Sequence, residues 1–527
     1  MFLKHFYKPI CRRLGGELLD SLSMLISGFD ISMSPTNLLA CIAGVLVGTL
    51  VGVLPGIGPV GAIALLLPLS YSMDAISSLI MLSGIYYGAM YGGSTTSILL
   101  NLPGEAASVV TCIDGYAMAK KGRAGAALAV AAIGSFIAGT MGLIGLTLFV
   151  PMLSKLSVVL GPPEYFAVAV VGLVVLCKLI GTSMLKSALM AAVGIMLGTI
   201  GMDSLSGISR FTFGIDELHR GVEFAIVVMG VFGLGEIIYT VTQPMGEISL
   251  QPVKFRELYP SQEEWRRSIA PIFRGGAIGF LVGLFPGPAA TVSTFISYAV
   301  EKQRSTTPEE FGRGAIEGVA GPEAANNAAA LATMIPLLSL GLPFAPASAI
   351  LLSGLTIHGI VPGPNLVTHH PDLFWGVIAS MYIGNLLLLI VNLPLVGIFV
   401  NILKTPINIL MPIVAIIIIT GAYSINSSFL DLALLIIFGI LGYLMKSTGY
   451  EPAPLIIGYV LGPTIESGLT QGLIIGNGEV WSFFTRPISG AILSIGIILI
   501  LYNLLKFVCY KKEWRRWTSS TFWLLKK

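Results

Sequence analysis

GTLVGVLPG (residues 48–56) and GFLVGLFPG (residues 279–287) are two versions of one motif, 231 positions apart, and each lies within a long apolar run. The proline of each motif has no N–H group, and the glycine that follows tolerates turn geometry, so a helix is expected to break there. Matched breaks in two hydrophobic segments are typical of transporters built from internal repeats. The motif therefore predicts two repeats, each containing a broken membrane helix.

A second pair of stretches supports the duplication. LPGEAAS (102–108) is followed 240 positions later by LPFAPAS (342–348), in the same order relative to the first motif. Basic residues follow 102–108 but not 342–348, whereas they follow 279–287 but not 48–56. Equivalent loops with opposite charge predict that the two halves insert in opposite orientations. Chance matches between Gly- and Pro-rich segments are the alternative.

The composition indicates a membrane protein. Of 527 residues, 55% are hydrophobic and only 11% are charged, whereas about 25% charged residues are usual in soluble proteins. The net charge of +3 does not suggest nucleic acid as a partner, and lipid is the expected surroundings of the apolar surface. The five cysteines are scattered, which disfavours both a disulfide framework and a zinc site.

Apolar stretches of membrane-spanning length recur along the chain. Each holds roughly 15 to 28 residues, close to the ~20 that cross a bilayer as a helix. With several broken stretches added, they predict ten to fourteen spans in an all-α polytopic bundle, because a spanning backbone must satisfy its own hydrogen bonds. The clear candidates lie near 38–54, 125–150, 165–181, 187–201, 222–241, 373–400, 406–421, 428–444 and 488–508.

Polar segments divide the chain into five parts. Three basic islands, at 114–123, 244–274 and 301–313, are expected on the cytoplasmic side. The predicted parts are a cytoplasmic or interfacial segment (1–37), a first membrane repeat (38–243), a cytoplasmic linker (244–274), a second repeat with following helices (275–508) and a basic tail (509–527).

The helix breaks are the first candidate binding site. A half-helix that starts inside the membrane presents free N–H groups and partial positive charge, which suit an anion, while free carbonyl groups suit Na⁺. The candidate residues at the breaks are Pro55, Gly56 and Gly58 in the first half and Pro286 and Gly287 in the second. Structural kinks without a ligand are the alternative.

Four consecutive hydroxyl residues form the second candidate: Ser94, Thr95, Thr96 and Ser97, within an otherwise apolar stretch. Hydroxyl groups can coordinate Na⁺ or donate hydrogen bonds to a carboxylate. The alternative is that each hydroxyl bonds to a carbonyl of its own helix.

The place judged to match in the second half holds Glu323, Asn326 and Asn327. Neighbouring asparagines inside an apolar helix are costly without partners, and their amides can bind a carboxylate or a cation. Glu323 is a candidate cation or proton site. The alternatives are helix–helix hydrogen bonds for the asparagines and the cytoplasmic end of a helix for the glutamate.

Motifs of common enzyme classes do not occur. The sequence has no Gly-x-Ser-x-Gly, no H-E-x-x-H and no phosphate-binding loop, so an enzyme or an ATP-driven pump is not expected. No cofactor or resident metal is predicted beyond a coupling cation, Na⁺ or H⁺, at the same candidate site.

Three stretches carry a resemblance to a known family. They are GVLPGIGPVGAIALLLPLSY (52–71), the run from 86 to 128 that begins YYGAMYGGSTTSILLNLPGEAAS, and EKQRSTTPEEFGRGAIEGVAGPEAANNAAA (301–330). They resemble the large membrane subunit of the bacterial tripartite tricarboxylate transporters. The resemblance implies a secondary carrier of about twelve helices in the inner membrane, coupled to a cation gradient. It also implies a small four-helix membrane subunit and a periplasmic solute-binding protein as partners.

The predicted function is therefore cation-coupled transport of organic di- or tricarboxylates. Two alternatives stay open: a passive anion channel, and a membrane receptor or scaffold subunit that does not transport.

Overall fold

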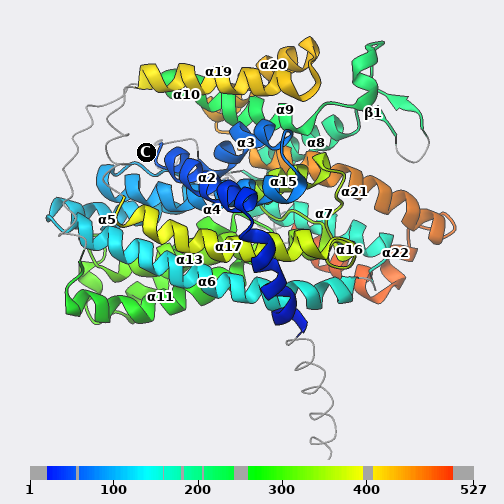
Figure 1. Cartoon of the computed structure of the whole chain (residues 1–527). Helices are drawn as coiled ribbons and strands as arrows, with labels where there is room; N and C mark the ends of the chain where they lie inside the picture. Colours follow the sequence, from blue (N-terminus) through cyan, green and yellow to red (C-terminus); the bar gives the residue numbers. More distant parts are fainter. Residues whose placement is uncertain are drawn as a thin grey trace, which may run out of the picture.

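The computed structural model describes residues 20–54, 58–157, 160–179, 183–203, 207–242, 259–395 and 407–501. Helices dominate it (Figure 1), and one short antiparallel pair joins β1 (Gly201–Met202) to β2 (Ser209–Arg210). The predicted all-α polytopic class is confirmed. Pro55 and Gly56 lie outside the described residues, as do 1–19, 243–258 and the predicted tail 509–527.

The first half of the chain alternates long and short helices. The elements are α2 (Pro35–Gly52), α3 (Gly58–Ser70), α4 (Ala75–Leu100), η1 (Ala106–Ser108), α5 (Val109–Lys120), α6 (Ala124–Ser157), α7 (Pro162–Leu179), α8 (Met184–Gly198), η2 (Asp216–Arg220), α9 (Phe224–Val228), the π-helical η3 (Met229–Leu234) and α10 (Gly235–Thr242).

The second half begins within the predicted linker, because α11 starts at Gln262. Its start is capped by Ser261, whose hydroxyl accepts from the Glu264 amide at 3.2 Å. The elements are α11 (Gln262–Gly283), α12 (Ala289–Arg304), η5 (Pro308–Glu310), α13 (Glu317–Ala332), α14 (Met334–Leu340), α15 (Pro346–Ile357), α16 (Pro364–His369), α17 (Pro371–Asn392), α19 (Ile407–Asn426), α20 (Phe429–Ser447), α21 (Ala453–Ile475) and α22 (Ser482–Thr485).

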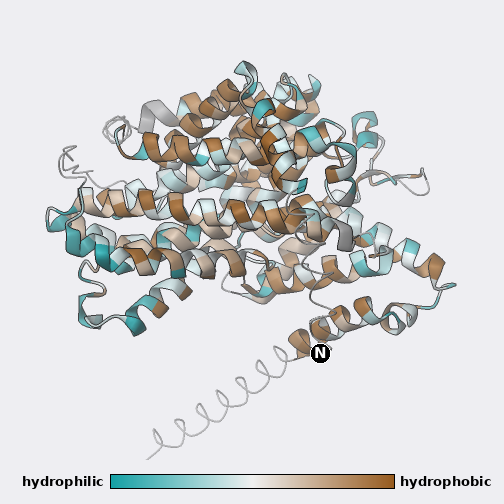
Figure 2. Cartoon of the chain, turned by 60° about the horizontal axis from the view of Figure 1, so that its bottom comes forward, coloured by the Kyte–Doolittle hydropathy of each residue, from teal (hydrophilic) through white to brown (hydrophobic). Residues whose placement is uncertain are grey.

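Several helices have the length and composition of membrane spans. Among the described residues, six helices are long and apolar enough to cross a bilayer, and further apolar helices are shorter. Figure 2 shows hydrophobic residues along most of these helices, with hydrophilic residues gathered at turns and ends. The chain is therefore a multi-pass membrane protein.

Glycines let α2 lie directly on the backbone of α4. A Cβ atom added at Gly44 or Gly48 would lie 2.4 or 2.5 Å from the carbonyl oxygen of Met81 or Ile85, respectively. Gly52 approaches the next turn of α4 in the same way, and its added Cβ would lie 2.3 Å from an α4 carbonyl oxygen. Small residues at such crossings let helices approach closely in a membrane.

The same contact recurs between α11 and α13. Added Cβ atoms at Gly275 and Gly279 would each lie 2.1 Å from a carbonyl oxygen, that of Gly321 or Ala325. Gly283 continues the row, as Gly52 does in the first half. The glycines repeat at the 231-residue spacing and their carbonyl partners at the 240-residue spacing of the two sequence motifs.

The turns that follow α4 and α14 are also alike. Asn101 and Gly341 both adopt left-handed backbone conformations, with φ of 57° and 71°. Seven residues later, Ser108 and Ser348 each donate a hydrogen bond to the carbonyl three residues before it, at 2.9 and 2.7 Å. The two segments thus share local structure as well as sequence, while their inverted orientation stays a prediction.

The three basic islands meet one another. Arg123 pairs with Glu264, with 3.1 Å between Nε and Oε1, and Arg267 pairs with Glu310 at 2.6 Å. Asp114 accepts a hydrogen bond from a backbone amide of the third island, that of Gly312, at 2.9 Å. In Figure 1, α5 of the first island and the strand β1 lie toward opposite sides of the molecule. Segments predicted to face one compartment therefore lie together at one end.

Candidate functional site

A cavity of about 520 Å³ lies where the helix breaks of both halves meet. In each half, the glycine at the predicted helix break lies beside the second duplicated stretch, 102–108 in the first half and 342–348 in the second. An added Cβ at Gly58 would lie 3.7 Å from the Gly104 carbonyl oxygen, and the Gly287 amide donates to the Phe344 carbonyl at 3.1 Å. Gly58, Gly104 and Gly287 all line the cavity. Gly58 and Gly287, one candidate residue from each half, therefore border one space.

Glycine is favoured at both breaks by backbone geometry. Gly58 has a φ of +63° and Gly287 a φ of +152°, values that side-chain-bearing residues rarely adopt. Of the other residues predicted at the breaks, Pro286 precedes Gly287, while Pro55 and Gly56 fall outside the described residues.

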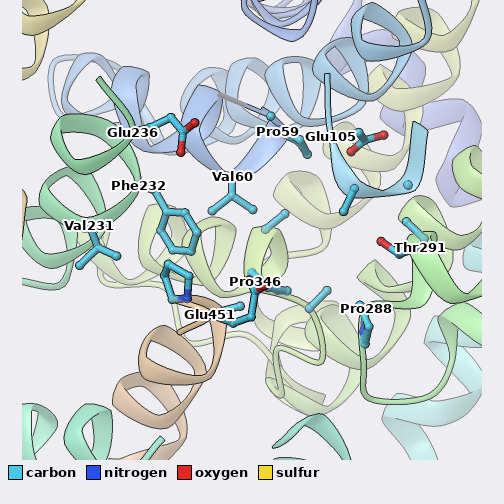
Figure 3. A pocket seen from close by; sticks show the side chains of 18 of the residues that line it. Pro59, Val60, Glu105, Val231, Phe232, Glu236, Pro288, Thr291, Pro346 and Glu451 are labelled. Atoms are coloured by element: carbon cyan, nitrogen blue, oxygen red, sulfur yellow. The ribbon is translucent and has the colours of Figure 1, made fainter. Parts of the chain in front are cut away.

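Helix starts surround the cavity. Gly58, Ala289, Pro346 and Ala453 are the first residues of α3, α12, α15 and α21, and all four line it. Within the described part of the chain, neither α12 nor α21 has a side-chain hydrogen bond at its N-cap. Their first-turn amides therefore offer hydrogen-bond donors and partial positive charge to a ligand. Figure 3 shows Pro59, Pro288 and Pro346 around this space.

Charged side chains stand among an otherwise mostly apolar lining. Glu105, Glu236, Lys446 and Glu451 line the cavity together with Val60, Met90, Val231 and Phe232. Asn326 donates from Nδ2 to Oε1 of Glu105 at 2.9 Å. Asn326 is 1% exposed, and its Oδ1 has no hydrogen-bond partner among the described residues. Asn326 itself therefore does not line the cavity, but it hydrogen-bonds to Glu105, which does.

A second polar cluster surrounds Glu323, which is 1% exposed. Ser94 donates to Oε2 of Glu323 at 2.6 Å, and Thr111 donates to Oε1. Asn327 donates to the Ser135 hydroxyl at 2.7 Å and to the Glu323 carbonyl at 3.1 Å. Asn327 therefore links α13 to α6 by the kind of helix–helix hydrogen bond that was the alternative to ligand binding.

A small cavity of about 10 Å³ adjoins this cluster, with room for about one water-sized particle. It is lined by Ser94, Thr95, Ser135 and Glu323, among others. Hydroxyl and carboxylate oxygens are ligands suited to a hard cation. The predicted residues are thus divided between two neighbouring places, the large cavity and the Glu323 cluster.

Two of the four predicted hydroxyls bond to their own helix. Thr96 and Ser97 both donate to the Gly93 carbonyl, at 3.0 and 2.9 Å. The glycine contacts also correct the match between the halves. Because Met81 corresponds to Gly321, the asparagine pair corresponds to Tyr86 and Tyr87, and the Ser94 run corresponds to the start of α14. Ser94 and Glu323 meet across helices and are not repeat equivalents.

Sequence reasoning missed Glu105, Thr111, Ser135, Glu236 and Lys446. A signal was present for three of them. Glu105 lies within the duplicated 102–108 stretch, and Glu236 and Lys446 belong to predominantly apolar helices, where an ionisable residue suggests function. Thr111 and Ser135 resemble many other buried hydroxyl residues, and only their contacts distinguish them.

Comparison with known proteins identifies the family. The chain is 48% identical over 496 residues to the "uncharacterized 52.8 kDa protein in TAR-I ttuC' 3'region" of Agrobacterium vitis, covering 94% of this chain and 99% of that protein. It is 47% identical over 235 residues to the "uncharacterized protein in TAR-II ttuC' 3'region" of the same organism, covering 45% of this chain and 97% of that protein. No solved structure matches it. The profile of the tripartite tricarboxylate transporter TctA family matches residues 38–457, and the chain therefore belongs to that family.

Proposed function

We propose that this chain is the membrane subunit that moves organic di- or tricarboxylates in a cation-coupled transporter. The observation that carries the proposal is the cavity of about 520 Å³, which the helix starts α3 and α12 border from the two matched segments. Its volume falls within the range of roughly 300–1,000 Å³ typical of small-molecule sites. Helix starts suit carboxylates because their free N–H groups point toward the bound anion.

Coupling to a cation is proposed at Glu323. An ionised carboxylate deep in a membrane protein costs roughly 3 kcal/mol or more without a compensating charge. Ser94 and Thr111, which bond to its carboxylate, are neutral. A proton or Na⁺ at Glu323 would remove this cost. Because Asn326 lies three residues along α13 and holds Glu105 at the cavity, neutralising Glu323 is expected to influence the carboxylate site.

The arrangement of the assembly is part of the same proposal. The two matched segments are inverted repeats in a bacterial inner membrane, with the three basic islands on the cytoplasmic side. Movement of one repeat-built element against the other exposes the cavity to each side in turn. A periplasmic solute-binding protein delivers the carboxylate, and a small four-helix membrane subunit completes the complex. The resemblance and the family support these partners.

Reconstitution tests the proposal. The full chain is placed in liposomes with the small subunit and the binding protein, and uptake of radiolabelled citrate, succinate and malonate is measured with and without Na⁺ and pH gradients. Saturable uptake above the equilibrium level, driven by one gradient, is expected. Non-saturable flux without the binding protein would indicate a channel. Binding without uptake would indicate a receptor, and either result contradicts the proposal.

A further inference from the structure

Lys446 is the one cationic side chain among the described residues that line the cavity, where it accompanies Glu105, Glu236 and Glu451. Three carboxylates and one ammonium are an unusual set for a site that receives anions. Helix starts can hold one carboxylate without any side-chain charge. The position of Lys446 therefore calls for a separate role.

Glu236 holds Lys446 at the cavity wall. The Lys446 ammonium lies 2.6 Å from Oε2 of Glu236 and 4.4 Å from the centre of the Tyr239 ring. The Lys446 side chain is 36% exposed, whereas that of Glu236 is 14% exposed. A partly exposed ion pair contributes little net stability, so an anion that enters the cavity can compete for the ammonium.

An irregular helix brings Glu236 to this wall. The π-helical turn η3 ends at Leu234, two residues before Glu236, and inserts an extra residue that rotates the following side chains by about 100°. Close packing against α20 completes the arrangement, since an added Cβ at Gly442 would lie 2.3 Å from the Val231 carbonyl oxygen. Short π-helical turns inside α-helices occur frequently at functional sites.

The start of α12 and Glu236 of the ion pair lie on different walls. In Figure 3, Glu236 and Phe232 lie on one side of the cavity and Pro288 and Thr291 on the other. Val60 and Met90 also line the space, so a short aliphatic carbon chain would find apolar contacts there. An anion with carboxylates at both ends would match the two polar walls and the apolar region.

We propose that Lys446 is the specificity-determining residue that binds a second carboxylate of the substrate. When the cavity is empty, Glu236 forms an ion pair with the Lys446 ammonium. This inference rests on the proposed function. It adds that a monocarboxylate gains nothing from Lys446, and that Glu236 acts as an internal competitor of the substrate.

The test uses the reconstituted complex and radiolabelled succinate and citrate, with unlabelled butyrate and succinamate as competitors that carry one carboxylate. Lys446→Gln is expected to raise KM for succinate and citrate about ten- to hundredfold, because a charge-assisted hydrogen bond is lost. Inhibition by butyrate and succinamate should be unchanged, and Lys446→Arg should restore much of the affinity. Glu236→Gln is expected to lower KM several-fold, a gain that misfolding cannot produce.

Arg210→Gln is the matched control, since Arg210 pairs with Glu466 at 3.1 Å and neither residue lines the cavity. The inference is overturned if Lys446→Gln leaves KM for succinate and citrate unchanged, or weakens inhibition by the single-carboxylate competitors equally. A higher KM in Glu236→Gln also overturns it. A wild-type complex that takes up none of the tested carboxylates overturns the proposed function and this inference together, a result distinguishable from failure of the variants alone.

Discussion

The segments α2–α4 and α11–α13 have nearly the same helix packing but different polar chemistry. Each places a row of glycines on the carbonyl oxygens of the partner helix, at Gly48 against Ile85 and at Gly279 against Ala325. At the 240-residue spacing, however, Ser83 stands where the second segment has Glu323. The backbone arrangement is thus shared, while the buried charge belongs to one segment.

This difference shows which features repetition preserves. A glycine that touches another backbone has no sterically equivalent replacement, so both segments need it. A buried carboxylate needs particular partners, and Glu323 finds them in Ser94 and Thr111 from the other half of the chain. Duplicated packing therefore supports a site whose chemistry is not itself duplicated.

The largest expected effect comes from filling the glycine contacts. Gly48→Ala and Gly279→Ala should each destabilise the protein by about 3 kcal/mol, because the new Cβ would overlap a carbonyl oxygen and force two helices apart. Thermal unfolding in detergent measures the loss. Gly172→Ala is the control, since a Cβ added at Gly172 would lie 3.7 Å from its nearest neighbour, a ring carbon of Phe344. Full tolerance at either Gly48 or Gly279 would show that the two contacts are not equivalent.

Removing the buried charge should separate transport from coupling. Glu323→Gln keeps the shape of the side chain but cannot exchange a proton or attract Na⁺, so gradient-driven accumulation should fall at least tenfold while carboxylate exchange persists. Both are measured in the reconstituted complex. Glu164→Gln is the control, because Glu164 is equally buried but pairs with Arg486 at 2.7 Å. Accumulation unchanged in Glu323→Gln would contradict the coupling role.

The two neighbouring asparagines should behave differently. Asn326→Ala releases Glu105 at the cavity and should raise KM for the transported carboxylate about tenfold. Asn327→Ala breaks a buried hydrogen bond to Ser135 and should destabilise the protein by about 1–3 kcal/mol while KM changes little. Uptake kinetics and thermal unfolding of both variants test this. Equal KM values in the two variants would remove the distinction.

The smallest effect is expected from the hydroxyls that bond to their own helix. Thr96→Val and Ser97→Ala remove hydrogen bonds to the Gly93 carbonyl of their own helix, so transport rates should stay within about twofold of the unmodified protein. Ser94→Ala, measured in parallel, should reduce accumulation because it removes a partner of Glu323. A large loss of transport rate in Thr96→Val would restore the prediction that all four hydroxyls bind a ligand.

Local patterns in the sequence predicted much of this molecule. Low charge and long apolar runs indicated membrane helices, and the repeated motifs located the breaks that Gly58 and Gly287 border at the cavity. These predictions succeed because bilayer thickness and backbone conformation act over short stretches of chain. The spacings of the motifs recur in the two rows of glycine contacts, which only the structure revealed.

Only the tertiary structure decided which polar groups meet. Ser94 bonds Glu323, Asn326 bonds Glu105 and Lys446 pairs with Glu236, although each pair is separated by more than two hundred residues. Such contacts depend on how each helix is rotated and shifted against its neighbours, and the π-helical turn η3 changes that rotation just before Glu236. Residue type and spacing along one helix do not specify the partner on another helix. The breaks were therefore predictable from the sequence, whereas the side chains that complete the site were not.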